Sequence, residues 1–249
     1  MVVSVKMKNS LVCTIVVLAA LIASPVSRSQ AAQFDPHDLS GVWQLAPGGG
    51  GQGPGDNFPP LAAWGQARYD ANKPGYGPKA APGGNDPILK CDPMGFPRIM
   101  FAIWPFEIIP IRGRILMFFE GHHTIREIWM DGRKLPDDPD PRWYGYSAGR
   151  WDGDTLVVET NNFNGRTRLD TNGHPHSDAL VLTERWTRPN LGTIDYVMQI
   201  HDPKTYTEDW KNVRQFQLRT DQEIMEYSCE ENNKSLWEGR IKPPKYEDQ

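Results

Sequence analysis

Two pairs of histidines are the residues of this sequence that are best suited to chemistry. His122 and His123 are adjacent, and His174 and His176 lie two residues apart in a long polar stretch. A neutral imidazole can accept or donate a proton near pH 7, because its ordinary pKa is about 6.5. His176 also follows Pro175, whose fixed φ restricts how the chain can aim the ring. We therefore predict His176 as a general acid or base, His123 for the opposite proton transfer and His174 as a further candidate.

Three charged residues complete the predicted catalytic site. Asp178 lies two residues after His176 and could orient one of its ring nitrogens. Arg126 lies in a predicted strand and Arg150 precedes a predicted turn, and a guanidinium there could stabilise an anion. In a small barrel an inward charge is either paired or held for a ligand, so structural ion pairs with strand glutamates stay open for the arginines. Exposed loop positions stay open for the histidines.

A metal site is a second use for the same residues, and we expect none. Zinc would need three or four ligands, which His123, His174, His176 and Asp178 could supply from across a barrel. The sequence has neither the HExxH nor the CxxC spacing that would support such a site. It also lacks a GxSxG elbow, a Walker loop and a GxGxxG turn between a strand and a helix, so we expect no nucleotide cofactor.

The elements around these residues are predicted to be short strands joined by turns. Asp152-Gly153 predicts the turn of a hairpin, and the run from 192 to 201 alternates apolar and polar side chains as a strand with two different faces does. Further strands are expected at 106–111, 114–120, 124–131, 179–186, 213–220 and 223–229. Roughly ten strands with almost no helical periodicity predict an all-β antiparallel barrel, because closure removes the edges of the sheet.

The chain is expected to begin with a signal peptide at residues 1–31. Lys6 and Lys8 provide a positive region, and Leu11 to Ile22 form an apolar run. Ser29-Gln30-Ala31 places small residues at the two positions that a signal peptidase reads. The apolar run is shorter than the roughly 20 residues that span a bilayer, so we expect cleavage and a periplasmic or secreted protein rather than a stable membrane anchor.

Residues 32–249 are expected to form a single barrel domain. Residues 47–87 are rich in glycine and proline and are predicted to be irregular, with one short helix at 61–69. Cys91 and Cys229 remain after cleavage, and an oxidising compartment allows them to form a disulfide, although two buried thiols stay open as the alternative.

Composition restricts the partners of the protein. The chain has 249 residues, 39% of them hydrophobic, and a formal net charge of −4. That content is sufficient for a buried core, and the acidic balance argues against binding to nucleic acid or to an anionic membrane surface. A hydrophobic or aromatic small molecule is the expected partner, and a homo-oligomer stays open.

Several motifs resemble a family of exported bacterial proteins. The matching residues are Asp38 to Trp43, Cys91 to Arg98, GRWDGDTLVVET at 149–160, Pro175-His176-Ser177, Glu184-Arg185 and CEENN at 229–233. The similarity covers most of the chain after the signal peptide, and the 149–160 string is specific. The Gly41-Val42-Trp43 run also resembles the opening strand of lipocalin-like barrels, in which the tryptophan closes the floor. The resemblance implies a secreted lipocalin-like β-barrel and no particular reaction.

Two functions follow from these expectations. The first is a cofactor-independent enzyme of the lyase, dehydratase or isomerase type, which uses histidine and carboxylate groups on a largely apolar small molecule. The second is a periplasmic carrier that binds such a molecule unchanged. Ionisable groups around the longest loop favour the enzyme. For an enzyme, His176→Ala is expected to lower turnover and to leave the fold nearly intact.

Overall fold

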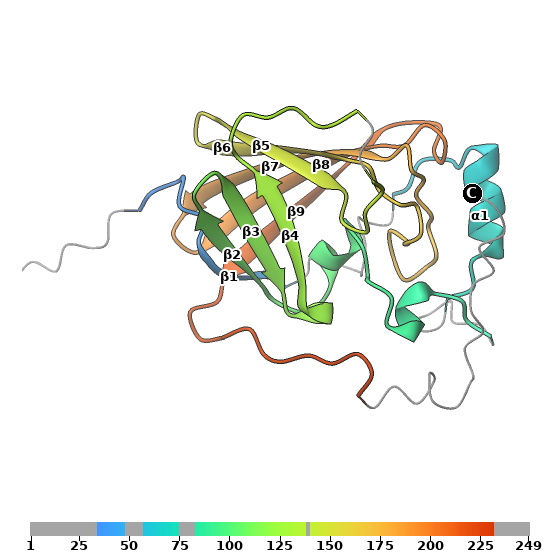
Figure 1. Ribbon diagram of the computed structural model, residues 1–249, viewed down its shortest axis with the longest axis horizontal. Coiled ribbons are helices and arrows are strands. Elements are labelled where there is room, and N and C mark those ends of the chain that lie inside the picture. Colours follow the sequence, from blue (N-terminus) through green and yellow to red (C-terminus); the bar gives the residue numbers. More distant parts are fainter. Residues whose placement is uncertain (1–33, 48–56, 75–82, 138–139, 232–249) are drawn as a thin grey trace, which may run out of the picture. The chain divides into compact units, whose positions relative to one another are not determined.

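The protein is a closed β-barrel. Figure 1 shows the computed structural model, which describes residues 34–47, 57–74, 83–137 and 140–231. Nine strands in these residues neighbour one another in sequence order, and the last returns to the first. They are β1 (Gly41–Leu45), β2 (Phe106–Ile111), β3 (Arg114–Phe119), β4 (Thr124–Trp129), β5 (Tyr146–Asp152), β6 (Thr155–Asn161), β7 (Val181–Asn190), β8 (Thr193–His201) and β9 (Trp210–Leu218). The predicted all-β, lipocalin-like barrel is confirmed.

One strand pair differs from the antiparallel expectation. β4 and β5 run parallel, with Ile128 opposite Ser147 and Trp129 opposite Ala148. All other neighbouring strands pair antiparallel. A parallel pair needs a connection of a dozen or more residues, because the chain must return to the end at which the first strand began. The stretch from 130 to 145 is long enough to make that return.

Trp43 of β1 is buried near the end of the barrel that carries the β7–β8 turn, which we call the floor. Its side chain is completely buried, and its indole nitrogen donates to the Leu39 carbonyl at 2.9 Å. The Arg188 guanidinium lies 5.2 Å from the centre of the Trp43 ring and donates to the carbonyls of Asp38 and Leu191. These bonds satisfy the two terminal nitrogens of the buried guanidinium, which would be costly to leave unbonded.

Aromatic and aliphatic side chains fill the barrel above Trp43. Trp186 stacks on Phe216 with 5.8 Å between ring centroids and meets Tyr196 edge-on at 4.5 Å. In β8 the residues Ile194, Tyr196, Met198 and Ile200 are all buried, so the predicted alternation of this strand is confirmed.

The mouth of the barrel is covered by residues 94–102, which we call the plug. It contains the 3₁₀ helix η2 (Arg98–Phe101), and its buried apolar residues are Met94, Phe96, Ile99, Met100, Phe101 and Ala102. The Phe96 ring lies 3.7 Å from the Arg126 guanidinium carbon in the interior. Side chains of the strands and of the plug thus share one buried core.

A helix and a long loop lie together at the mouth end of the barrel (Figure 1). α1 (Ala63–Ala71) begins and ends two residues later than predicted, and the loop spans 162–180 between β6 and β7. Asn72 donates to the Gly173 carbonyl of the loop at 2.8 Å. Gly65 packs so closely on the Thr205 carbonyl that a Cβ atom would come within 2.2 Å of its oxygen. α1 is therefore fixed against both the loop and the β8–β9 connection.

The strand predicted at 223–229 does not form. A closed barrel has no free edge left for it, because β9 already pairs with β1. Its backbone is instead bound by side chains: Met225 donates to the Glu120 carboxylate at 3.0 Å, and the Tyr227 amide lies 2.9 Å from the His123 ring. His123 belongs to the 3₁₀ turn η3 (Gly121–His123) between β3 and β4.

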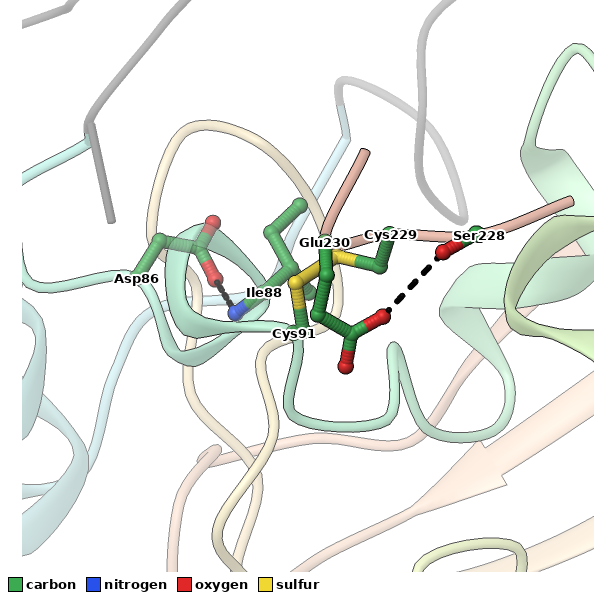
Figure 2. The surroundings of a disulfide bond; sticks show 6 residues. All are labelled: Asp86, Ile88, Cys91, Ser228, Cys229 and Glu230. Atoms are coloured by element: carbon green, nitrogen blue, oxygen red, sulfur yellow. Dashed lines mark hydrogen bonds between the residues drawn. A yellow bond between two sulfur atoms is a disulfide. The ribbon is translucent and has the colours of Figure 1, made fainter. Parts of the chain in front are cut away.

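A disulfide fixes the end of this segment. Cys229 is bonded to Cys91, which directly follows the 3₁₀ helix η1 (Pro87–Lys90), and the two Cα atoms are 5.5 Å apart (Figure 2). The Cys91–Cys229 alternative is thereby confirmed over two free thiols. The expected signal peptide and parts of the excursion, at 48–56 and 75–82, lie outside the described residues. Within the described residues, no helix has the length and apolarity needed to cross a membrane.

Candidate functional site

His176 is a buried residue of the loop. Its side chain is 1% exposed, its Nδ1 donates to the Ser177 carbonyl at 3.1 Å, and its Nε2 lies 2.6 Å from the Thr167 hydroxyl. Burial lowers the pKa of His176 below its ordinary value, because the charged form is poorly solvated there. The neutral ring can then accept from Thr167 while it donates to Ser177. Both ring nitrogens are engaged in holding the two sides of the loop together.

His174 joins the loop to α1. Its Nδ1 donates to the Asp170 carboxylate at 2.7 Å. Its ring is stacked on Phe58, with 3.7 Å between centroids, and on Tyr69 of α1, with 4.8 Å. Burial acts to raise the pKa of Asp170, but hydrogen bonds from the His174 side chain and from backbone amides outweigh it and leave this pKa lowered. His174 therefore contacts a different set of neighbours from His176.

His123 contacts the backbone of residues 223–229 and not the 162–180 loop in the described hydrogen bonds. Its Nε2 lies 3.0 Å from the Met225 carbonyl and 2.9 Å from the Tyr227 amide nitrogen. A single ring nitrogen either donates or accepts, so one tautomer satisfies one of these partners at a time. The three predicted histidines thus lie in three different surroundings, and the described contacts do not join them into one acid–base site.

Arg126 points into the barrel, as an inward strand charge was expected to do. It donates to both carboxylate oxygens of Glu184 and to the hydroxyls of Ser147 and Thr160. Tyr196 donates to the same carboxylate at 2.9 Å. The paired structural ion that the sequence left open is therefore what the interior contains.

Arg150 and Asp178 lie on the surface. Arg150 donates to Glu159 at 2.9 Å on the outside of the barrel, and more than two fifths of each side chain is exposed. Asp178 accepts from the Lys204 ammonium at 2.9 Å. The described part of the chain contains no group of three or more His, Cys, Asp or Glu residues that could hold a metal ion.

Asp178 and Lys204 belong to a pocket beside the mouth of the barrel. This mouth pocket has a cavity volume of about 130 Å³ and is lined by Trp64, Arg68, Asn164, Gly165, Ser177, Asp178 and Lys204. Two of these residues come from α1, four from the 162–180 loop and one from the β8–β9 connection. It is the candidate functional site, because side chains of different chemistry converge there on one concave surface.

The floor of the mouth pocket depends on the loop contacts around His176. Gly165 has a φ of +62°, and a Cβ atom there would lie 3.3 Å from the Asp178 nitrogen, so the two sides of the loop run in close contact. Ser177 donates through both its amide and its hydroxyl to the buried Asp202 carboxylate, at 2.7 and 2.6 Å. His176 directly precedes Ser177 of the pocket wall, and both of its ring nitrogens bind within the loop.

The charges of the mouth pocket are arranged around Trp64. The Arg68 guanidinium lies 5.2 Å and the Lys204 ammonium 5.0 Å from the centre of its ring. The hydrogen bond from Lys204 lowers the pKa of Asp178, so this carboxylate stays ionised near pH 7. Trp64 therefore offers an aromatic surface close to two cations.

Sequence reasoning found only Asp178 among these residues. Trp64 and Arg68 share one face of α1, because they are four positions apart in a helix, and this spacing was the available signal. Asn164 and Lys204 carry no comparable signal, since they lie far from the helix in sequence and meet it only through the fold.

The fold places the protein in the class of closed, lipocalin-like β-barrels, and the candidate pocket lies beside the mouth of the barrel. Comparison of the chain with known protein families, with curated proteins and with solved structures found no match.

Proposed function

We propose that the protein binds a small molecule in the mouth pocket. The observation that carries this proposal is the convergence of Trp64, Arg68 and Lys204 on one concave site beside the longest loop. Aromatic surface with a few converging polar groups is the usual composition of a small-molecule site. The bound molecule lies beside the mouth of the barrel, because the pocket is there.

Binding without chemistry is favoured over acid–base catalysis by the state of the ionisable groups. The carboxylate of Asp178 is already paired with Lys204, and both nitrogens of His176 are engaged. A general base needs a free lone pair within hydrogen-bond reach of the proton that it removes. We therefore prefer the carrier to the lyase, dehydratase or isomerase.

We also propose that the protein is exported. We take residues 1–31 as a signal peptide and place the protein in the periplasm or outside the cell, as its resemblance to exported bacterial proteins implies. The Cys91–Cys229 disulfide supports this location, because such bonds persist in oxidising compartments. Mass spectrometry of the protein recovered from an exporting host should find a terminus near Ala32, and an intact Met1 would contradict it.

A fragment screen tests binding. Isotope-labelled protein beginning at Ala32 is titrated with small neutral, anionic and cationic compounds, and the backbone amides of Asn164, Gly165 and Lys204 are followed by NMR. Ligands of the mouth pocket should shift these amides together, and Trp64→Ala should abolish the shifts.

The matched control is Trp151→Ala, because Trp151 is also partly exposed but stacks on His37 at the floor end. It should leave the shifts unchanged. No fragment that moves the pocket amides, or shifts that survive Trp64→Ala, would refute the proposal. Recovery of a chemically altered fragment would favour the enzyme.

A further inference from the structure

The charged groups that line the mouth pocket leave one positive charge uncompensated. Arg68 and Lys204 are cationic and Asp178 is anionic, and the Asp178–Lys204 pair is closed by a 2.9 Å hydrogen bond. Within the described residues, no carboxylate pairs with Arg68. A guanidinium left without a carboxylate beside a pocket is a binding group for an anion, since it offers a planar fork of donors.

The other polar groups of the pocket also favour an acceptor as the ligand. The side-chain oxygen of Asn164 accepts from the Arg166 amide at 3.0 Å, which leaves the NH₂ group of this side chain for a ligand. The Ser177 hydroxyl donates to Asp202 and accepts from the Ala179 amide at 3.0 Å, so it is already in use. Apart from the Asp178 carboxylate, which accepts from Lys204, the remaining side-chain groups of the pocket are therefore hydrogen-bond donors.

The size of the pocket limits the part of the ligand that it encloses. Its volume of about 130 Å³ is several times the roughly 10 to 15 Å³ that a single water molecule requires. This space accommodates a carboxylate with a few carbon atoms beside it. Trp64 supplies an apolar surface for those carbon atoms.

We infer that the ligand of the mouth pocket is a small monocarboxylate, whose carboxylate is bound by Arg68 and Asn164 and whose carbon atoms lie on Trp64. This inference rests on the proposed binding function and names the ligand class of the same site. Arg68 suits a carboxylate better than a lysine would, because two parallel N–H groups can meet two oxygens.

The test compares ligands that differ only in charge. Propionate and benzoate are titrated against propionamide and benzamide, with the Asn164 and Gly165 amides as the readout. The carboxylates should bind about 10- to 100-fold more tightly, which is the usual effect of a charge-assisted hydrogen bond. Their affinity should also fall as sodium chloride is raised, because salt screens an exposed charge.

Variants of Arg68 identify the group responsible. Arg68→Gln should remove the preference for carboxylate over amide, and Arg68→Lys should keep part of it. Arg185→Gln is the matched control, because Arg185 is an exposed arginine that donates to Asp152 on the outside of the barrel. It should leave both affinities unchanged, and the amide spectrum of each variant reports whether it is folded.

The outcomes separate the two proposals. Amides that bind as tightly as the carboxylates and remain unaffected by Arg68→Gln would overturn the carboxylate inference and leave the binding function standing. Inorganic phosphate that binds as tightly as propionate, with no dependence on Trp64, would overturn it as well. A screen in which no small molecule shifts the pocket amides would overturn both.

Discussion

The Arg126 guanidinium donates to both carboxylate oxygens of Glu184 inside the barrel, and neither side chain is more than 1% exposed. Ser147 and Thr160 accept further bonds from Arg126, and Tyr196 donates to Glu184. The pair therefore connects strands β4 and β7 across the interior through a hydrogen-bonded network. Removal of one partner leaves the other charge buried without compensation.

Arg126→Met should accordingly destabilise the protein by about 3 to 5 kcal/mol. Arg150→Met is the matched control, because the Arg150–Glu159 pair joins the same residue types on the outer surface, where the side chains are 62% and 44% exposed. It should cost less than about 1 kcal/mol. Urea denaturation followed by tryptophan fluorescence measures both free energies of unfolding. A loss from Arg126→Met as small as that from Arg150→Met would show that the interior pair is not important for stability.

The barrel could be predicted because its signal is local. Strand alternation and turn glycines such as Gly153 act over a few residues, and they specified which runs form strands. The partner of each inward charge could not be predicted, since Arg126 and Glu184 are 58 positions apart on strands that are not neighbours. The strand expected at 223–229 failed for a related reason, because closure of the barrel removed the edge on which it could pair.

Most residues of the mouth pocket could not be predicted from the sequence either, because they are brought together only by long-range packing. A histidine in a polar loop suggests proton transfer. Whether its ring is exposed or buried depends on tertiary packing, which the spacing of residues in the sequence does not encode. His176 is consequently a residue of the loop interior, and Trp64, Arg68 and Lys204 meet only when α1 packs on the loop and on the β8–β9 connection. Asp178 was found because it follows the same His-Ser pair in the sequence.

The disulfide gives a second prediction. Cys91→Ser with Cys229→Ser opens a loop with a sequence separation of 138 residues, and the chain-entropy treatment puts the loss at about 4 to 5 kcal/mol. Denaturation of the oxidised wild type and of the double variant measures this loss. Thiol titration of the denatured wild type without reductant should find no reactive thiol at these two positions, and two would contradict the disulfide.

Gly95 of the plug meets the 162–180 loop, and this contact gives a third prediction. Gly95 and Gly113 both have a φ of +77°, but a Cβ atom on Gly95 would lie 2.4 Å from the Thr167 side chain, while one on Gly113 would meet nothing within 4 Å. Each alanine substitution should cost about 1 to 2 kcal/mol for the left-handed backbone. Gly95→Ala should lower the free energy of unfolding more than Gly113→Ala does, because it must also displace Thr167. Gly95→Ala should weaken ligand binding as well, because Thr167 contacts His176, which precedes Ser177 of the pocket wall. Equal thermal stabilities of the two variants would contradict this packing.

The last prediction concerns His176, for which the structure changes the expected effect of mutation. Because the ring is buried and bonded at both nitrogens, His176→Ala should destabilise the fold by about 2 to 4 kcal/mol through a cavity and two lost hydrogen bonds. His201→Ala is the control, because His201 is half exposed and bonds only Asp209 through its ring in the described structure. It should cost less than about 1 kcal/mol at pH 8.

The same burial determines how stability depends on pH. The pKa of His176 is lowered in the folded protein, so between that value and the unfolded pKa of about 6.5 the unfolded chain binds the extra proton. The stability that the neutral, buried His176 ring contributes to the folded protein is therefore fully present above about pH 6.5. It is lost progressively as the pH falls below that value. Burial and the nearby Arg98 lower the pKa of His122 in the same direction, so His176→Gln should reduce the acid-side slope without abolishing it. Urea denaturation from pH 8 to pH 5 measures the slope, and an unchanged slope in the variant would show that the wild-type imidazole takes up its proton inside the fold as readily as in water.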